Sequence, residues 1–369
     1  MLYVLYTFIA AFSIQLIYYL LIFSRVYFIK PAEVTLNSFP TSVLLCARNE
    51  SENLDRILPL LLAQNYPDFE LVLINDGSFD DTLEKFKAFK LKNNTTHNIK
   101  IVDVIENENF WGNKKYALSL GIKAASFEQL LFIDADCIPL SEKWIAEIVQ
   151  NFKDDIEIVL GYGAHDKVKH SLFNKLLRFE TLYTAIQYFS YAKIGIPYMG
   201  VGRNLAYKKS LFYKSNGFAK HMHIKSGDDD LFINQNATRK NIALAISHES
   251  FTSSLPKKDL IKWISQKRRH ISTADQYKFI HKFLLGLSYI SQLFFWIFAS
   301  VLLILNYNFI LITSIIVVRI FIQYLIIGFS ANKLKEKDLI FWIPFFEIFL
   351  ICVQLYIFIQ NKISKPTHW

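Results

Sequence analysis

Charge is missing from three long stretches of this 369-residue sequence. Positions 1–24 hold no charged residue, positions 283–330 hold only Arg319, and positions 339–360 hold only Glu347. About 20 apolar residues are enough for a helix to cross a bilayer. These stretches therefore predict a membrane anchor over residues 1–24 and further membrane helices over residues 283–361, with a turn near position 307.

The first stretch also lacks the basic start and the small-residue cleavage site of a signal peptide, so we expect an uncleaved anchor. Arg25 follows this segment and Lys282 precedes the next one, and basic residues favour the cytoplasmic side of a membrane. We therefore expect a multi-pass protein of the bacterial plasma membrane with its soluble domain in the cytoplasm. The last segment, interrupted at Pro344, is either a span or a re-entrant segment. Only a re-entrant segment keeps Lys362 on the cytoplasmic side, with the other basic residues.

Cysteine is scarce, and nucleic-acid-binding motifs are absent. The three cysteines have neither paired nor metal-ligand spacing, which excludes a disulfide scaffold and a zinc-finger site and is typical of a reducing compartment. The net charge of +9 is expected to attract anionic membrane lipid. Membrane lipid is thus an expected partner, and nucleic acid is not.

Residues 37–276 have the composition of a soluble α/β domain, in which short apolar runs alternate with helical patterns. This alternation predicts a doubly wound, mostly parallel sheet that binds ligands beyond the carboxyl ends of its strands. The expected strands are Ser42–Ala47, Glu70–Asn75, Lys100–Ile105, Leu130–Ile133 and Glu157–Gly161. The expected helices are Ser51–Gln64, Asp80–Leu91, Asn113–Ala125, Glu142–Phe152, Leu172–Tyr191, Asp228–Arg239 and Asp259–His270.

Two carboxylates follow the fourth of these strands. Asp134 and Asp136 are separated by one residue, so strand alternation directs both to the same side. Magnesium and manganese prefer oxygen ligands, and such sites commonly combine one or two carboxylates with substrate phosphates. The pair therefore predicts a divalent-metal site; the alternative is a pair of acids that cap a loop.

Three consecutive acids, Asp228, Asp229 and Asp230, follow Gly227. Mutual repulsion raises the pKa of at least one of them, which suits a group that accepts a proton from a hydroxyl. The alternative is a charged helix N-terminus that is stabilised by the helix dipole.

In order and spacing, these motifs resemble the family 2 glycosyltransferases with the GT-A fold, and most closely the cellulose, hyaluronan and ceramide-glucosyl synthases. The resemblance implies inverting transfer from a nucleotide sugar, most often a UDP-sugar. It also extends to Gln266 and Arg269, which match a Gln-x-x-Arg-Trp motif in which His270 replaces the tryptophan. Gly200–Asn204 resembles the family's acceptor-side loop.

Roles for individual residues follow from this resemblance. It implies that Asp229, with Asp228 second, is the catalytic base and that Asp136 and Asp134 hold the metal. It also implies that the donor is bound by Ala47, Asn49, Glu50, Asp76, Lys114, Asp134, Gln266 and Arg269. For Asp76, Lys114 and Arg269 the alternatives are a helix-capping turn, a solvated lysine and an interfacial basic helix that binds lipid headgroups.

Two departures from the family pattern keep another function open. Asn75 stands where the family usually has an acid, and His270 lacks the aromatic platform of processive enzymes. These support a degenerate, non-catalytic scaffold or sugar-nucleotide sensor. A nucleotidyltransferase would need a glycine-rich basic loop after the first strand, which Arg48-Asn49-Glu50 is not. Because four spans are few for a polymer channel, we expect a lipid-linked or membrane-proximal saccharide acceptor.

Overall fold

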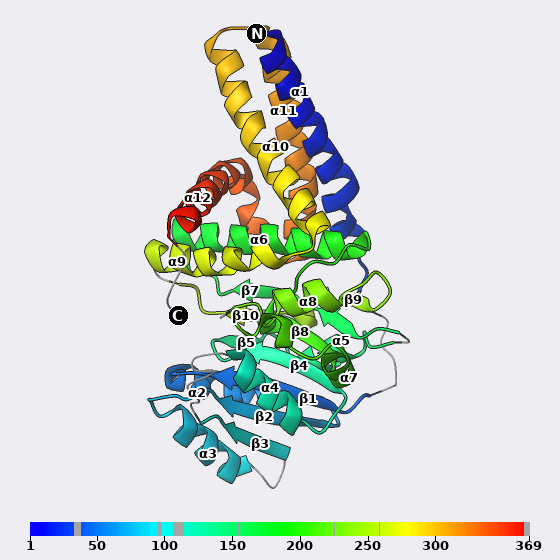
Figure 1. Ribbon diagram of the computed structural model, residues 1–369, viewed down its shortest axis with the longest axis vertical. Coiled ribbons are helices and arrows are strands. Elements are labelled where there is room, and N and C mark those ends of the chain that lie inside the picture. Colours follow the sequence, from blue (N-terminus) through cyan, green and yellow to red (C-terminus); the bar gives the residue numbers. More distant parts are fainter. Residues whose placement is uncertain are drawn as a thin grey trace. The chain divides into compact units, whose positions relative to one another are not determined.

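The computed structural model describes residues 1–32, 38–93, 98–105, 114–153, 155–224, 226–257 and 259–364. The chain forms two compact units, both drawn in Figure 1. The sheet unit comprises Lys30–Asp166 and Pro197–Pro256. The helical unit comprises Met1–Ile29, Lys167–Ile196 and Lys257–Trp369.

The sheet unit is built on a seven-stranded sheet of order β3-β2-β1-β4-β8-β6-β9. Four neighbouring strands, β3-β2-β1-β4, are parallel, and β8 runs antiparallel to both β4 and β6. The predicted doubly wound, mostly parallel sheet is therefore confirmed. Its strands are β1 (Thr41–Ala47), β2 (Phe69–Asn75), β3 (Asn98–Asp103), β4 (Gln129–Asp134), β6 (Ile158–Leu160), β8 (Leu205–Lys208) and β9 (Ile242–Leu244).

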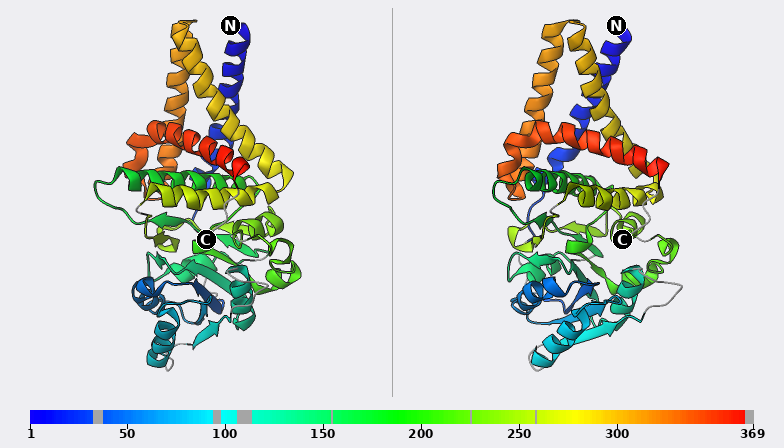
Figure 2. Two further views of the ribbon diagram at one scale, coloured as in Figure 1. Left: turned by 60° about the vertical axis from the view of Figure 1, so that its left-hand side comes forward. Right: turned by 90° about the vertical axis from the view of Figure 1, so that its left-hand side faces the viewer.

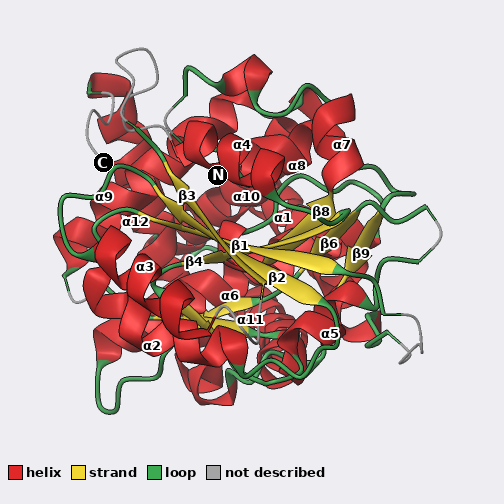
Figure 3. Cartoon of the chain, turned by 90° about the horizontal axis from the view of Figure 1, so that it is seen from below, coloured by secondary structure: helices red, strands yellow, loops and turns green. Residues whose placement is uncertain are grey.

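Helices lie on both sides of this twisted sheet (Figure 3). One side holds α2 (Ser51–Leu62), α3 (Thr82–Asn93) and α5 (Trp144–Val149), and the other holds α4 (Lys114–Ala124), α7 (Lys209–Lys214) and α8 (Asp230–Asn236). Successive side chains of a strand point to opposite sides of the sheet, so each side has its own apolar core. Leu45 packs with α2 and α5 on one side, whereas Leu44 and Ile74 face α4 on the other. A Cβ on Gly121 of α4 would meet Ile74 Cδ1 at 2.1 Å, so this glycine allows the close packing of helix and sheet.

A second, three-stranded sheet of order β5-β10-β7 joins distant parts of the sheet unit. Its strands are β5 (Cys137–Pro139), β10 (Thr252–Ser254) and β7 (Gly163–His165). Strand β10 pairs antiparallel with β5 and parallel with β7. The chain that follows the acid pair is thereby held beside residues more than a hundred positions later.

In the helical unit, α1 (Leu2–Ile17), α10 (Phe279–Ile304) and α11 (Phe309–Lys333) run side by side (Figure 2). Phe8 of α1 stacks on Phe295 of α10 with ring centroids 5.0 Å apart. The predicted turn is present between α10 and α11, where Asn306 and Asn308 have positive φ angles of 50° and 46°. A π-helical turn (Tyr18–Ile22) and a 3-10 turn (Phe23–Phe28) continue α1.

The last hydrophobic segment contains α12 (Ile343–Ile363), which lies across the other three long helices rather than along them (Figures 1 and 2). Pro344 is in the first turn of α12, after a 3-10 turn over Lys337–Trp342, so this proline begins a helix and does not break one. In the described part of the chain, four helical segments are long and apolar enough to cross a membrane: Leu2–Phe28, Phe279–Ile304, Phe309–Lys333 and Lys337–Ile363.

The two isolated charges of the C-terminal apolar stretches pair with each other. Arg319 Nη1 lies 2.6 Å from Glu347 Oε2, and Arg319 Nε donates to Gln15 Oε1 at 2.8 Å. Arg319 is fully buried, and Gln323 accepts a further hydrogen bond at 2.7 Å. Ionisable groups in apolar helices need such partners, so the pair explains how both charges are tolerated.

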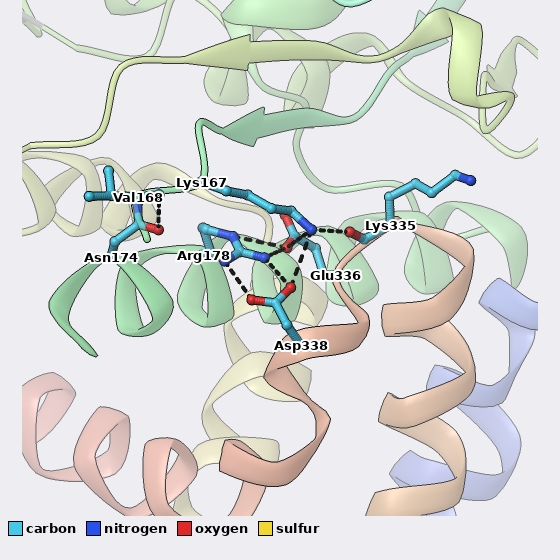
Figure 4. A network of polar contacts seen from close by, with 7 residues as sticks. All are labelled: Lys167, Val168, Asn174, Arg178, Lys335, Glu336 and Asp338. Carbon is cyan, nitrogen blue, oxygen red and sulfur yellow. Dashed lines mark hydrogen bonds and ion pairs between the residues drawn. The ribbon is translucent and has the colours of Figure 1, made fainter. Parts of the chain in front are cut away.

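The helical unit also contains α6 (Leu172–Lys193) and α9 (Leu260–Ile271). Figure 4 shows how Arg178 of α6 is held. Its guanidinium pairs with Glu336 and, at 2.6 Å, with Asp338, both from the segment between α11 and α12. Lys167 joins the network through Asp338 at 3.2 Å. These ion pairs connect α6 to the C-terminal segment.

Candidate active site

The turns after β1 and β2 hold each other. Asp76 N donates to Ala47 O at 2.9 Å, Asn49 N donates to Ser78 Oγ at 3.0 Å, and Phe79 N donates to Asn49 Oδ1 at 2.8 Å. Glu50 is tied to the same region, because its N–H donates to Thr82 Oγ1 at 3.0 Å. The structure thus brings Ala47, Asn49, Glu50 and Asp76 together at the carboxyl edge of the sheet.

The acid pair lies at the end of β4 on the same edge. Carboxylate oxygens of Asp134 and Asp136 and the Sγ of Cys137 all lie within 4.8 Å of one another. Burial and the neighbouring carboxylates raise the pKa of the Cys137 thiol well above its usual range, and its Sγ lies 3.2 Å from Asp136 Oδ1. A neutral thiol beside two carboxylates leaves oxygen as the available ligand, which fits magnesium or manganese.

Lys114 begins α4 and connects two of the predicted acidic motifs. Its Nζ lies 2.7 Å from Asp134 Oδ1 and 3.2 Å from Asp228 Oδ2. Burial alone would lower the pKa of Lys114, but Asp134 and Asp228 raise it well above the usual value. The lysine therefore stays positively charged at the pocket. Asn113, where the helix was predicted to begin, lies outside the described residues.

Asp228 and Asp229 are adjacent but have opposite pKa shifts. Asp229 caps α8 and accepts hydrogen bonds from Asp230 N and Gly202 N, each at 2.7 Å. Burial, followed by the charges of Asp228 and Asp230, raises the pKa of Asp229 to about 7. For Asp228, burial is outweighed by Lys114, and its pKa is lowered. Of two neighbouring carboxyl groups whose pKa values differ in this way, the one with the higher pKa can accept a proton and the other can remain charged.

Lys115 is a site-supporting residue that sequence reasoning missed. Its side chain is completely buried, and its Nζ donates to the carbonyl oxygens of His221, Ile224 and Ser226 at 2.8, 2.9 and 2.7 Å. These carbonyls belong to the segment that leads into the three acids. Burial lowers the pKa of Lys115 to about 8. In the sequence, two adjacent lysines at the start of a helix give no signal that one of them is buried and bonded to the backbone.

Lys114, Asp134, Asp228 and Asp229 line one open pocket, whose empty space is about 320 Å³ with the adjoining solvent included. It opens where β1, β4 and β8 meet the beginnings of α4 and α8. Acidic side chains dominate its polar lining, so it suits a cation and the anionic group that the cation would bind. The lining includes Cys46, Lys114, Asp134, Gly202, Asp228 and Asp229.

Gln266 and Arg269 belong to α9 in the helical unit, so their approach to this pocket stays a prediction. Their neighbours in the motif have contacts within that unit. Lys267 Nζ lies 2.5 Å from Glu180 Oε2, and Arg268 Nε donates to Asn361 Oδ1 of α12 at 2.9 Å. Lys267 and Arg268 thus fasten α9 to α6 and α12.

The chain is similar in sequence to known proteins. Residues 42–214 match the family described as Glycosyl transferase family 2. A poly-β-1,6-N-acetyl-D-glucosamine synthase of Staphylococcus epidermidis is 42% identical over 97 residues, which are 26% of this chain and 22% of that protein. The corresponding synthase of Staphylococcus aureus (strain COL) is 34% identical over 138 residues, 35% of this chain and 31% of that protein. The matches thus span between a fifth and a third of these relatives.

A solved structure is also similar in fold. It is a mannosyltransferase of Pyrobaculum calidifontis in complex with GDP-Man and Mn²⁺, with a TM-score of 0.60. The two chains share 15% identity, and the likeness covers 92% of this chain and 95% of the other. At this identity the comparison shows the fold alone. Residues 42–214 therefore match the family 2 glycosyl transferases, and the chain has a GT-A-like fold.

Proposed function

We propose that the protein is an inverting, metal-dependent glycosyltransferase that moves a sugar from a nucleotide donor to a lipid-linked or membrane-proximal saccharide. The observation that carries this proposal is the split pair of carboxyl groups in the pocket. Asp229, with a pKa of about 7, is suited to accept a proton at cellular pH, while Asp228 remains charged beside Lys114. An acidic turn with only a structural role would not require this difference between the two pKa values.

The donor would lie along the carboxyl edge of the sheet. Ala47, Asn49, Glu50 and Asp76 would bind its nucleoside, and Lys114 would meet its diphosphate, close to the N-terminus of α4. A UDP-sugar remains our expectation. The staphylococcal relatives are named for N-acetylglucosamine and the archaeal neighbour was solved with GDP-Man, so donors of both kinds are the first to test.

The acid pair fits a magnesium or manganese ion. Lys114 already pairs with Asp134, so Asp136 is the carboxylate more readily available as the direct ligand. A bound ion would neutralise the negative charge of the departing nucleoside diphosphate.

Asp229 would accept the proton of an acceptor hydroxyl while that oxygen forms its bond to the anomeric carbon. On the opposite face of the sugar, the bond from the anomeric carbon to the diphosphate oxygen breaks, and the bonding electrons leave with the diphosphate. Lys114 and Arg269 would stabilise that charge by ion pairing. The configuration at the anomeric carbon is inverted, so an α-linked donor yields a β-linked product.

We place the sheet unit on the cytoplasmic side of a bacterial plasma membrane, in keeping with the bacterial relatives. Three long helices run together, whereas α12 lies across them. An α12 at the membrane surface would leave Lys362 on the same side as Lys30, which agrees with the distribution of basic residues. The membrane would supply the acceptor.

Release of nucleoside diphosphate tests the proposal. Protein in nanodiscs is incubated with UDP-N-acetylglucosamine, UDP-glucose or GDP-mannose, with Mn²⁺ or Mg²⁺, in the presence of bacterial lipid extract. We expect metal-dependent release from one donor, abolished in Asp136→Ala and Asp229→Asn and retained in Lys123→Met, which changes an exposed lysine of α4. Absence of both release and donor binding by calorimetry would favour the non-catalytic scaffold.

A further inference from the structure

Arg203 is a charged side chain that the proposed chemistry has not used. It belongs to the 3-10 turn Gly202–Asn204, directly before β8. Its Nη1 has two long contacts, 3.3 Å to Ser254 Oγ and 3.5 Å to His165 Nε2, and its Nε is buried without a hydrogen-bond partner in the described part of the chain. None of the ion pairs found among the described residues includes Arg203. The residue as a whole is partly exposed, and its guanidinium is permanently charged.

The backbone that carries this arginine is firmly held. Asn204 is completely buried, and its Nδ2 donates to Tyr162 O at 2.9 Å and to Ser250 O at 2.8 Å. Thr252 Oγ1 donates to the carbonyl oxygen of Arg203 itself at 3.0 Å. The guanidinium is therefore presented from a fixed base, which reduces the ordering cost of binding a ligand.

A glycine on β7 leaves room for the side chain. A Cβ on Gly163 would lie 2.4 Å from Arg203 Nε and 2.7 Å from its Cδ and Cγ. The arginine lies flat against β7 only because position 163 has no side chain. Any other residue there would displace the guanidinium without altering its charge.

Arg203 also borders the groups assigned to catalysis. The preceding residue, Gly202, donates its N–H to Asp229 at 2.7 Å. Ser254, which contacts the guanidinium, pairs in register with Cys137, the residue after Asp136. Arg203 thus follows the residue that binds the proposed base, and its charge acts on Cys137, the residue after Asp136.

We propose that Arg203, together with His165 and Ser254, forms a binding site for a phosphate oxyanion. This inference rests on the proposed function. An arginine binds phosphate through two parallel N–H groups, and Ser254 and His165 would hold the guanidinium in position. The phosphate is either part of the donor's diphosphate or the phosphate of a lipid-linked acceptor, and binding experiments separate these two sources.

The donor source is tested by calorimetry with UDP and Mn²⁺, with uridine as the phosphate-free probe. If Arg203 binds the diphosphate, Arg203→Gln weakens UDP binding by about ten- to a hundredfold and leaves uridine binding unchanged, as expected for one charge-assisted contact. Arg203→Lys, which keeps the charge, restores part of the affinity. Arg239→Gln, which changes an exposed arginine of the same unit, leaves UDP binding unchanged.

The acceptor source is tested by native mass spectrometry of detergent-held protein titrated with a polyprenyl phosphate or the matching polyprenol. If Arg203 binds the acceptor, Arg203→Gln weakens binding of the phosphate by at least about tenfold and does not change binding of the alcohol. In either case Gly163→Ala reproduces the loss, and the double variant is no weaker than Arg203→Gln, because both changes remove one interaction. Melting temperatures near wild type show that the variants fold.

Equal affinity of wild type and Arg203→Gln for both UDP and the polyprenyl phosphate would overturn the inference and leave the proposed function intact. A wild-type protein that binds neither nucleotide nor phosphate lipid would instead remove the proposed function on which the inference rests. Loss of affinity for uridine and the alcohol as well would also overturn it, since that pattern indicates a structural role.

Discussion

Asp228 is one of two neighbouring charges that, after burial, raise the pKa of Asp229, so removing its charge should shift the pH dependence of the reaction. Asp228→Asn keeps the size of the side chain and abolishes one of the two negative charges that raise the pKa of Asp229. Burial, the largest cause of the shift, is unaffected, and Asp230 remains. We therefore expect the pKa of Asp229 to fall from about 7 without returning to its ordinary value.

The size of the effect is set by the usual influence of one neighbouring carboxylate on a pKa. Carboxylates on adjacent residues commonly shift each other by about one pKa unit or more. A base with a pKa of about 7 is roughly one-tenth ionised at pH 6, whereas a base with a pKa one unit lower is about half ionised. Between pH 8 and pH 6, kcat/KM should thus fall about tenfold in the wild type and about twofold in the variant.

The assay is the initial rate of nucleoside diphosphate release between pH 5 and pH 9, at a low concentration of acceptor and a saturating concentration of metal. Ionisation of Asp229 is required of a base, so activity rises with pH through its pKa. The plateau of Asp228→Asn should lie below that of the wild type, because a weaker base transfers protons less well. Asp155→Asn, which changes an exposed acid of the sheet unit, serves as the control.

Two results would refute this reasoning. An unchanged midpoint in Asp228→Asn would mean that the charge of Asp228 does not set the pKa of Asp229. Persistence of the same acid limb in the residual activity of Asp229→Asn would mean that another group produces it.

Three further predictions concern the buried Lys115, the proposed metal site and the buried ion pair of the helical unit. Lys115→Met leaves three backbone carbonyls without their ammonium partner, and we expect kcat to fall about tenfold or more with the Kd of UDP unchanged by calorimetry. Asp136→Ala should weaken Mn²⁺ binding, measured by electron paramagnetic resonance, by about an order of magnitude, whereas Cys137→Ser should not. Glu347→Gln leaves Arg319 buried without its counter-charge, and should destabilise the helical unit by about 3–5 kcal/mol in thermal melts; Arg319→Met combined with Glu347→Met should recover most of the loss.

The strand ends of the sheet were predictable from local patterns. Continuous apolar runs located β1 at Thr41–Ala47 and β4 at Gln129–Asp134 to within a residue, because buried parallel strands leave this signature in the chain. Parallel order then required Asp76 and the acid pair to share one edge, as the structure confirms. The uncharged stretches likewise identified the long apolar helices from length and composition alone.

Contacts between distant segments could not be predicted in this way. Lys115 reaches carbonyl groups more than a hundred positions later, and Arg203 lies against Gly163 forty positions earlier. Nothing local distinguishes a lysine that is buried from one that is solvated, since the outcome depends on which backbone groups the fold brings near. The antiparallel direction of β8 and the pairing of Arg319 with Glu347 likewise depend on which distant segments the fold brings together.

The sequence alone thus determined the location of the apolar helices, the alternation of strands and helices, and the acidic motifs that follow the strands. These depend on periodicity and composition, which act over a few residues. Only the tertiary structure decided which carboxyl group has a pKa near 7, which lysine pairs with the acids of the site and, among the described residues, which arginine has a buried Nε without a hydrogen-bond partner. Burial and electrostatic interaction depend on distance in space, and the folded chain sets those distances.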